Sequence, residues 1–377
     1  MYIAQKQLEN IRRYMFSDKV IVIYGARRTG KTTLLKRIVE DLDEKYLFLS
    51  GEDIITKEYL ESQSIEKLKS FVKDNKVLFI DEAQNIKNVG LNLKLIVDHI
   101  PDIQIIATGS SSFDLAQNIG EPLTGRKFTF LMYPLSQLEL SKKESIIQTK
   151  GNLESRLIFG SYPEIILAEN IEEKRMLLKE IVSSYLFKDI LELEGIKKSD
   201  KVMRMLQLIA FQIGKEVSYQ EIGRQLGISK NTVEKYLDLL EKSFVIKKIV
   251  GFSRNLRKEI SKNPRYYFLD NGIRNALINN FNPINLRNDI GQLWENYLVM
   301  ERLKKQEYTF VQQNIYFWRT YDKKEIDLIE EREGKLFGYE IKWSNKTKRN
   351  SSKLWLSSYS NAEFKIINRE NYLEFIE

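Results

Sequence analysis

The chain has no cysteine, and His99 is the only histidine among its 377 residues. The lack of cysteine excludes disulfides, thiolate zinc sites and cysteine nucleophiles. His99 lies at the end of the predicted helix GLNLKLIVDHI, and we expect it to be a helix-end residue rather than a catalyst. Any hydrolytic chemistry therefore has to use carboxylates, lysine and a hard metal ion such as Mg²⁺.

Long apolar runs are also missing. No run approaches the roughly 18 residues of a membrane helix, and the first residues, MYIAQKQLENIRRYMF, do not have the pattern of a signal peptide. The composition, 42% hydrophobic and 30% charged, is that of a globular protein, and the length suggests two or three domains. We expect a cytoplasmic protein with no membrane contact.

Positive charge is concentrated in one segment. Residues 201–270 contain 14 Lys and Arg against 7 Asp and Glu, which accounts for most of the chain's net charge of +8. A basic segment in a nearly neutral chain is typical of a surface that binds an acidic polymer. A merely solvated surface is the alternative.

A nucleotide-binding motif lies near the N-terminus, in VIVIYGARRTGKTTLLKRI. An apolar strand is followed by a glycine-rich turn and a helix, and Gly25 to Thr32 fit GxxxxGK[ST]. Such a loop surrounds phosphates with backbone N–H groups, while its lysine reaches the β- and γ-phosphates and its threonine binds Mg²⁺. The predicted ATP contacts from this motif are Gly25, Arg28, Gly30, Lys31, Thr32 and Thr33, although Arg28 has packing as an alternative role.

The rest of an ATP-hydrolysing site is predicted at the ends of two further apolar strands. KVLFIDE provides Asp81 as an outer-sphere ligand of Mg²⁺ and Glu82 as the base that orients the attacking water. DIQIIATGSSS provides Thr108, Ser110 or Ser111 as a sensor of the γ-phosphate, and the sequence does not decide among them.

These motifs resemble the AAA+ ATPases, in particular a prokaryotic branch with paired arginines in the P-loop. The resemblance implies a homo-oligomer, for example a hexamer. It also implies that Arg126 in LTGR acts as an arginine finger in a neighbouring subunit, with a surface arginine as the alternative. GSYPE, residues 160–164, resembles an element that contacts nucleotide in related ATPases, and residues 136–200 would form a helical lid.

Within the basic segment, VSYQEIGRQLGISKNTVEKYLDLLEKSFVIKKI indicates two helices joined by a turn at Gly227, then a strand. The pattern resembles a winged helix, which binds DNA or docks proteins. The predicted DNA contacts on the second helix and in the basic wing are Lys230, Asn231, Lys235, Tyr236, Arg254, Arg257 and Lys258. Lys262 and Arg265 belong to the same basic loop.

The last part of the chain combines a helix carrying Glu295 with strands carrying Asp327 and YEIKW. Glu-x-Lys occurs four times in the chain, so Glu340–Lys342 is not diagnostic alone; Glu363–Lys365 also falls in a predicted strand. Only Glu340 has an acid, Asp327, on the strand directly before it, and a hairpin would bring Asp327, Glu340 and Lys342 together.

This set resembles the PD-(D/E)XK nuclease superfamily. The resemblance implies that Asp327 and Glu340 bind Mg²⁺, that Glu295 contacts the metal, and that Lys342 orients or deprotonates the attacking water. The alternative is a degenerate domain that keeps the fold and only binds.

The predicted fold is α/β. Its expected parts are a P-loop AAA+ parallel sheet core (1–135), a helical lid (136–200), a winged helix-turn-helix (201–270) and a C-terminal restriction-endonuclease-like domain (271–377). The predicted function is that of an ATPase that acts on branched, forked or single-stranded DNA. The alternatives are an ATP-controlled signalling or defence switch, or a DNA or protein remodeller with a non-catalytic C-terminal domain.

Overall fold

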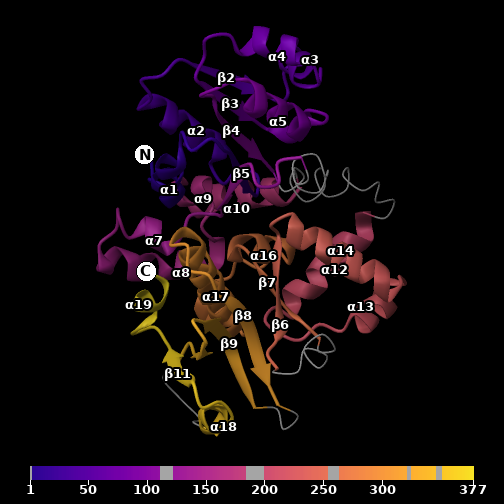
Figure 1. Ribbon diagram of the computed structural model, residues 1–377. Helices are drawn as coiled ribbons and strands as arrows, with labels where there is room; N and C mark the ends of the chain where they lie inside the picture. The colour runs from indigo at the N-terminus through magenta and orange to yellow at the C-terminus, as the bar shows by residue number, and fades with distance from the viewer. Residues whose placement is uncertain (1, 111–121, 184–198, 254–262, 321–323, 345–349) are drawn as a thin grey trace. The chain divides into compact units, whose positions relative to one another are not determined.

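The computed structural model describes residues 2–110, 122–183, 199–253, 263–320, 324–344 and 350–377 (Figure 1). The described residues form two compact units. The first extends to Leu135, and the second holds most of the chain from Ser136 to Glu377. The elements of the first unit are α1 (Lys6–Tyr14), β1 (Val20–Gly25), α2 (Lys31–Glu40), β2 (Tyr46–Ser50), α3 (Ile54–Leu60), α4 (Ile65–Val72), β3 (Val77–Asp81), η1 (Ala83–Asn85), α5 (Val89–His99), β4 (Gln104–Gly109) and β5 (Lys127–Met132).

The first unit is a five-stranded parallel sheet with helices on both faces. Its strand order is β2-β3-β4-β1-β5, so β4 lies between β1 and β3. Every residue of β1 is buried, because alternate side chains face the helices on opposite sides. Val20 and Val22 belong to the core under α4 and α5, whereas Ile21 and Ile23 belong to the core under α1 and α2. The parallel sheet core predicted from the apolar strands is therefore confirmed.

The second unit contains helices and a mixed sheet. Its elements are α7 (Gln137–Leu140), α8 (Ile146–Phe159), α9 (Pro163–Leu167), α10 (Ile171–Ile181), α12 (Ser199–Phe211), α13 (Tyr219–Leu226), α14 (Lys230–Lys242), β6 (Ile246–Gly251), β7 (Arg265–Phe268), α16 (Asn271–Leu277), η3 (Ile284–Leu286), α17 (Ile290–Tyr308), β8 (Asn314–Arg319), β9 (Glu325–Arg332), β10 (Lys335–Ile341), α18 (Asn350–Ser358), β11 (Ala362–Ile367) and α19 (Tyr372–Ile376).

One six-stranded sheet runs through this unit in the order β11-β10-β9-β8-β6-β7. β8, β9 and β10 form an antiparallel meander (Figure 1). β9 and β10 are joined by the two-residue turn Glu333–Gly334, whose residues have φ of 51° and 72°. β6 pairs with β8 in parallel through Val250–Tyr316. The strands expected in the wing and those expected in the C-terminal domain are therefore parts of one sheet across residue 270.

The helices α13 and α14 are defined by caps and by apolar spacing. Ser218 Oγ accepts a hydrogen bond from the Glu221 amide, and Ser229 Oγ accepts one from the Thr232 amide. Gly227 ends α13 with φ 62°, the left-handed conformation predicted for this turn. Val233 and Leu237, four residues apart on α14, are fully buried.

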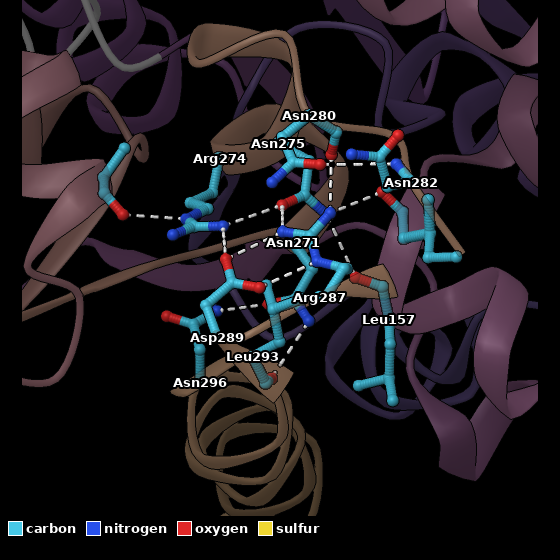
Figure 2. A network of polar contacts seen from close by, with 12 residues as sticks. Leu157, Asn271, Arg274, Asn275, Asn280, Asn282, Arg287, Asp289, Leu293 and Asn296 are labelled. Carbon is cyan, nitrogen blue, oxygen red and sulfur yellow. Dashed lines mark hydrogen bonds and ion pairs between the residues drawn. The ribbon is translucent and has the colours of Figure 1, made fainter. Parts of the chain in front are cut away.

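A buried polar network holds α16 against its neighbours (Figure 2). Arg274 donates to the Ala210 carbonyl of α12 (2.8 Å) and to Asp289 before α17 (2.5 Å). Asn275 donates to the Leu157 and Ile158 carbonyls of α8, and Arg287 binds Asp289 through two nitrogens at 2.8 Å. Because a buried polar group is expensive to leave unpaired, this network fixes the position of α17 relative to α8 and α12.

Candidate nucleotide site and C-terminal acidic site

The P-loop connects β1 directly to α2. Gly30 is the N-cap of α2 with φ 97°, which turns the first amides of the helix toward the loop. Gly25 lies against β5, where a Cβ would stand 2.2 Å from the Met132 carbonyl oxygen. No side chain fits there, so the sequence requires glycine at the strand end.

Lys31, Thr32 and Asp81 come together at the carboxyl edge of the first sheet. Lys31 is buried, and its ammonium donates to the carbonyls of Gly25 (2.8 Å) and Ala26 (3.0 Å). The Thr32 hydroxyl donates to Asp81 Oδ2 at 2.6 Å, and the Thr108 hydroxyl donates to Asp81 Oδ1. A hydroxyl beside a carboxylate is the oxygen-only donor set that suits Mg²⁺, so these residues fit the predicted ion.

Glu82 has a left-handed backbone conformation with φ 53°, and its amide donates to Thr108 Oγ1 at 3.1 Å. Its carboxylate accepts a hydrogen bond from the Gln84 side-chain amide, whose oxygen accepts from the Ser110 amide at 3.3 Å. Gln84 therefore links the predicted base to the predicted γ-phosphate sensor strand. Sequence reasoning assigned it no role, although a polar residue two positions after the acid was visible.

The remaining predicted nucleotide contacts lie farther from this centre. Arg28 and Thr33 are exposed. Arg126 is exposed too, and its Nε donates to Asp98 Oδ1 at 2.9 Å. Ser111 lies outside the described residues. The roles given to these side chains remain predictions.

In the second unit, the β9–β10 hairpin brings Asp327, Glu340 and Lys342 together. Lys342 Nζ lies 3.1 Å from Glu340 Oε1 and 3.9 Å from Asp327 Oδ2, and the Ile341 amide donates to Asp327 Oδ2 at 2.7 Å. Burial raises the pKa of Asp327, and Lys342 opposes that rise. Burial would lower the pKa of Lys342, but Asp327 and Glu340 raise it above its ordinary value.

Glu295, on α17, is engaged by β7 instead. The Tyr267 hydroxyl donates to Glu295 Oε1 at 2.7 Å, and Arg265 NH1 lies 3.9 Å from the same oxygen. Burial, followed by the nearby Asp327, raises the pKa of Glu295 to about 8. In this arrangement Glu295 carries a proton at neutral pH.

Among the residues that the structure describes, no three or more acids or histidines form a group that could hold a metal ion. Glu295 therefore does not join Asp327 and Glu340 in a three-carboxylate site, which differs from the expected ligand set. Asp327 and Glu340 still face one ammonium, and Mg²⁺ at phosphate-processing sites uses one or two carboxylates, completed by water and phosphate oxygens. The donor set fits Mg²⁺ in this two-carboxylate form.

The competing Glu363–Lys365 pair has a different setting. Both residues are exposed on β11, at the edge of the sheet, and Lys365 lies 3.4 Å from Glu374. This pair is therefore a natural control for Glu340–Lys342.

The predicted DNA contacts are only partly described. Lys230, Asn231 and Lys235 are exposed on α14, and Tyr236 is half-buried. Arg254, Arg257, Lys258 and Lys262 lie outside the described residues. A pocket of about 370 Å³ beside α14 is lined by Tyr219, Asn231, Glu234, Lys235, Asp238, Glu241, Lys248 and Tyr266. The acids Glu234, Asp238 and Glu241 place negative charge beside the predicted DNA contacts Asn231 and Lys235.

The expectation that Arg265 lies in a basic loop is wrong. Arg265 begins β7, is 3% exposed and forms an ion pair with Glu325 of β9. The reason is a long-range contact. Because β7 belongs to the same sheet as β9, the Arg265 guanidinium lies next to the Glu325 carboxylate.

The GSYPE turn also has a partner within the second unit. The Ser161 amide donates to Asp270 Oδ2 at 2.7 Å, and a Cβ on Gly160 would stand 1.9 Å from Asp270 Oδ1. Asp270 in turn caps α16 through the amides of Gly272 and Ile273. The turn thus anchors α16, and its predicted nucleotide contact remains a prediction.

Comparisons with known families divide the chain into three. Residues 17–141 match the family described as an AAA domain, residues 150–284 match a domain of unknown function (DUF8612), and residues 290–372 match another (DUF4143). Together with the five-stranded parallel sheet and the P-loop, the first match defines an AAA-type P-loop ATPase domain in the N-terminal part of the chain.

Relatives that match most of this chain are found in bacteria and archaea. An uncharacterised protein of Mycobacterium tuberculosis is 25% identical over 88% of this chain and 72% of its own length. An uncharacterised protein of Methanocaldococcus jannaschii is 25% identical over 88% of this chain and 77% of its own length. A signal-transduction ATPase from Pyrococcus horikoshii, with a tetratricopeptide repeat sensor, covers 81% of this chain at 13% identity with a TM-score of 0.30, and this chain covers 46% of it. None of the described helices is long and apolar enough to span a membrane.

Proposed function

We propose that this chain hydrolyses ATP at its P-loop, binds DNA and cleaves it at the C-terminal acidic site. The observation that carries the ATPase part is the contact of one carboxylate, Asp81, with the hydroxyls of Thr32 and Thr108. Mg²⁺ held at Thr32 and Asp81 would offset charge that develops on the phosphate oxygens. Lys31 binds the β- and γ-phosphates, and Glu82 orients the attacking water and accepts its proton.

The ATPase proposal is tested by hydrolysis assays with Mg²⁺. Lys31→Ala is expected to abolish ATP binding, and Glu82→Gln to preserve binding while reducing turnover about 100-fold or more. Lys36→Ala, which removes an exposed lysine from the same helix, serves as the control. Equal turnover in Glu82→Gln and wild type would remove Glu82 from the mechanism.

DNA binding is proposed for α13 and α14 as a helix-turn-helix, with the β6–β7 hairpin as its wing. The proposal is supported by the net +7 charge of residues 201–270 and by the exposure of Lys230 and Lys235. Few base-reading side chains accompany these lysines, so contacts to the phosphate backbone dominate. Branched, forked or single-stranded DNA is therefore the proposed substrate rather than a fixed duplex sequence.

Phosphodiester cleavage is proposed at Asp327, Glu340 and Lys342. Mg²⁺ bound by the two carboxylates would offset the negative charge of the scissile phosphate. Lys342, 3.1 Å from Glu340, holds the attacking water and lowers its pKa through its positive charge. The test is cleavage of forked, single-stranded and duplex DNA by wild type and Glu340→Gln, with Glu363→Gln as the control.

Assembly is proposed as a homo-oligomer, for example a hexamer, in which Arg126 completes a neighbouring subunit's ATP site. Its exposed guanidinium is held by a single aspartate, Asp98, which a stronger anion can displace. Mixing Arg126→Ala with Lys31→Ala subunits tests this, since a site acting in trans would recover part of its turnover in the mixture.

A second candidate keeps the ATPase but makes the acidic site non-catalytic, as in a switch or a remodeller. The observation that favours it is that no group of three or more acids or histidines among the described residues could hold a metal ion. This candidate predicts ATP-dependent assembly or DNA binding that is unchanged in Glu340→Gln and Lys342→Ala, with no cleavage by any variant.

A further inference from the structure

A buried arginine of β7, Arg265, lies among acidic residues beside the proposed C-terminal site. Arg265 is 3% exposed and forms an ion pair with Glu325, and it lies 3.9 Å from Glu295. The Cζ atom of its guanidinium also lies 4.3 Å from the centre of the Phe317 ring, a cation–π contact. The Nε atom is buried and has no hydrogen-bond partner among the residues that the structure describes. Because arginine stays protonated in proteins, a full positive charge sits among these acids.

β7 itself is held at this position by α17. The Asn296 side-chain amide donates to the Phe268 carbonyl (2.9 Å) and accepts from the Phe268 amide (2.8 Å). This pair of bonds satisfies the backbone of Phe268 at the outer edge of β7, the last strand of the sheet. Glu295 precedes Asn296, so the same contact brings Glu295 to Tyr267 and Arg265. Arg265 and Tyr267, which precede the predicted C-terminal domain (271–377), thus contribute side chains next to the acidic site.

We propose that Arg265 is the internal counter-cation of the acidic site, which sets how strongly that site attracts a divalent cation; this proposal rests on the proposed C-terminal site. Three carboxylates, Glu325, Asp327 and Glu340, and the protonated Glu295 have three cationic neighbours: Arg265, Lys342 and, 4.0 Å from Glu325, Arg319. Arg265 holds Glu295 and Glu325 in place and lowers the negative potential felt by an ion near Asp327. It acts through these acids and is therefore a positioning residue.

The test compares Mn²⁺ binding, measured by titration calorimetry, in wild type, Arg265→Gln and Arg265→Lys. Arg265→Gln keeps a planar amide but removes the charge, so Mn²⁺ is expected to bind about tenfold more tightly. Arg265→Lys keeps the charge and is expected to bind Mn²⁺ as wild type does. Arg332→Gln, an arginine near Glu330 on the same sheet, is the matched control and should not change the constant.

Glu325→Gln provides the opposite shift. Its side chain is 40% exposed, so the variant keeps its fold, and removing its charge should weaken Mn²⁺ binding about threefold. General structural damage would weaken binding in both variants, whereas the proposal requires shifts of opposite sign. If Arg265→Gln does not fold, Glu325→Gln and Arg265→Lys decide the matter alone.

The proposal is overturned if Arg265→Gln binds Mn²⁺ no more tightly than wild type, if Arg332→Gln shows the same gain, or if no variant binds Mn²⁺. A wild type that binds Mn²⁺ but cleaves no DNA would defeat the nuclease proposal alone. The dissociation constants would still decide the role of Arg265.

Discussion

Lys342 Nζ lies 3.9 Å from Asp327 Oδ2, near the end of the β9–β10 hairpin. The last paired residues of this ladder are Tyr339 and Leu328, one position before Glu340 and Asp327. Beyond that pair, the Asp327 side chain, rather than a strand carbonyl, accepts the Ile341 amide. The two strands therefore part where the acids and the lysine face each other. The Lys342 side chain is 37% exposed at this point, so a water molecule or a phosphate oxygen can approach its ammonium.

Cleavage should depend on the hairpin pair and not on its exposed counterpart. We expect Lys342→Ala and Glu340→Gln each to reduce DNA cleavage about 100-fold or more. The first variant loses the charge that activates water, and the second loses a metal ligand. Lys365→Ala and Glu363→Gln on β11 should cleave at the wild-type rate. Initial rates on one forked substrate measure the effect, and equal losses in the two pairs would contradict the assignment.

Gln84 should affect turnover more than nucleotide affinity. Its side chain bonds the Glu82 carboxylate and the Ser110 amide, so Gln84→Ala leaves the predicted base less well oriented. We expect the kcat for ATP to fall about tenfold with little change in the dissociation constant for ATP. Asn85→Ala, at an exposed neighbouring position, is the control. A change in affinity with an unchanged kcat would show that Gln84 acts on binding instead.

Two glycine substitutions should have opposite effects on stability. Gly25→Ala places a Cβ 2.2 Å from the Met132 carbonyl and should lower the free energy of unfolding of the first unit by about 2 kcal/mol or more. Gly151→Ala, inside α8, meets nothing within 4 Å and should raise that of the second unit by about 0.5–1 kcal/mol.

Tryptophan fluorescence separates the two effects. All four tryptophans, Trp294, Trp318, Trp343 and Trp355, belong to the second unit. The denaturant midpoint by fluorescence should rise in Gly151→Ala and stay unchanged in Gly25→Ala, whose loss appears in circular dichroism. A fluorescence midpoint lowered by Gly25→Ala would show that the units unfold together.

The elements that were predicted from sequence are those whose signals are local. The P-loop, the acid-ended strand at Asp81 and the hairpin that joins the strands of Asp327 and Glu340 each depend on residues close to one another in the chain. Their positions follow from apolar runs and turn chemistry, which a single sequence contains.

Long-range pairing was not predictable in the same way. β6 pairs with β8 through Val250 and Tyr316, and no local pattern specifies that partner. Arg265 stands in a run of basic residues typical of a solvated loop, yet its partner Glu325 lies 60 residues later. A charged side chain is buried only where it has such a partner. Because the order of the strands could not be predicted from the sequence, Arg265 was wrongly expected in a solvated loop.

Glu295 should make the stability of the second unit depend on pH. Its pKa is about 8 in the folded protein against an ordinary value of 4.5, so between these values the folded state keeps a proton that the unfolded state releases. The wild-type free energy of unfolding therefore falls as pH rises through this window. Because glutamine does not titrate, the free energy of unfolding of Glu295→Gln should rise relative to that of wild type by about 3–4 kcal/mol from pH 5 to pH 8.

Urea unfolding in EDTA, followed by tryptophan fluorescence at several pH values, measures that difference. The control is Glu363→Gln, whose exposed carboxylate lies at the sheet edge. A difference between Glu295→Gln and wild type that is constant from pH 5 to pH 8 would mean that Glu295 is ionised in the folded protein.

DNA contacts on α14 should appear in the salt dependence of binding. Lys230→Ala and Lys235→Ala are each expected to weaken binding to all DNA structures alike and to reduce the slope of log K against log salt by about 1. Asp238→Asn, which removes negative charge from the pocket beside α14, should strengthen binding. Unchanged slopes would place the DNA surface elsewhere, including the basic residues outside the described chain.

The most direct test of the whole account is one assay matrix. Wild type, Lys31→Ala, Glu340→Gln and Glu363→Gln are incubated with duplex, single-stranded, forked and four-way DNA in Mg²⁺, with and without ATP. The account predicts DNA-stimulated ATP hydrolysis that is lost in Lys31→Ala. It also predicts cleavage products that are lost in Glu340→Gln and kept in Glu363→Gln. Products that are the same in all four proteins, or ATP hydrolysis that no DNA stimulates, would contradict it.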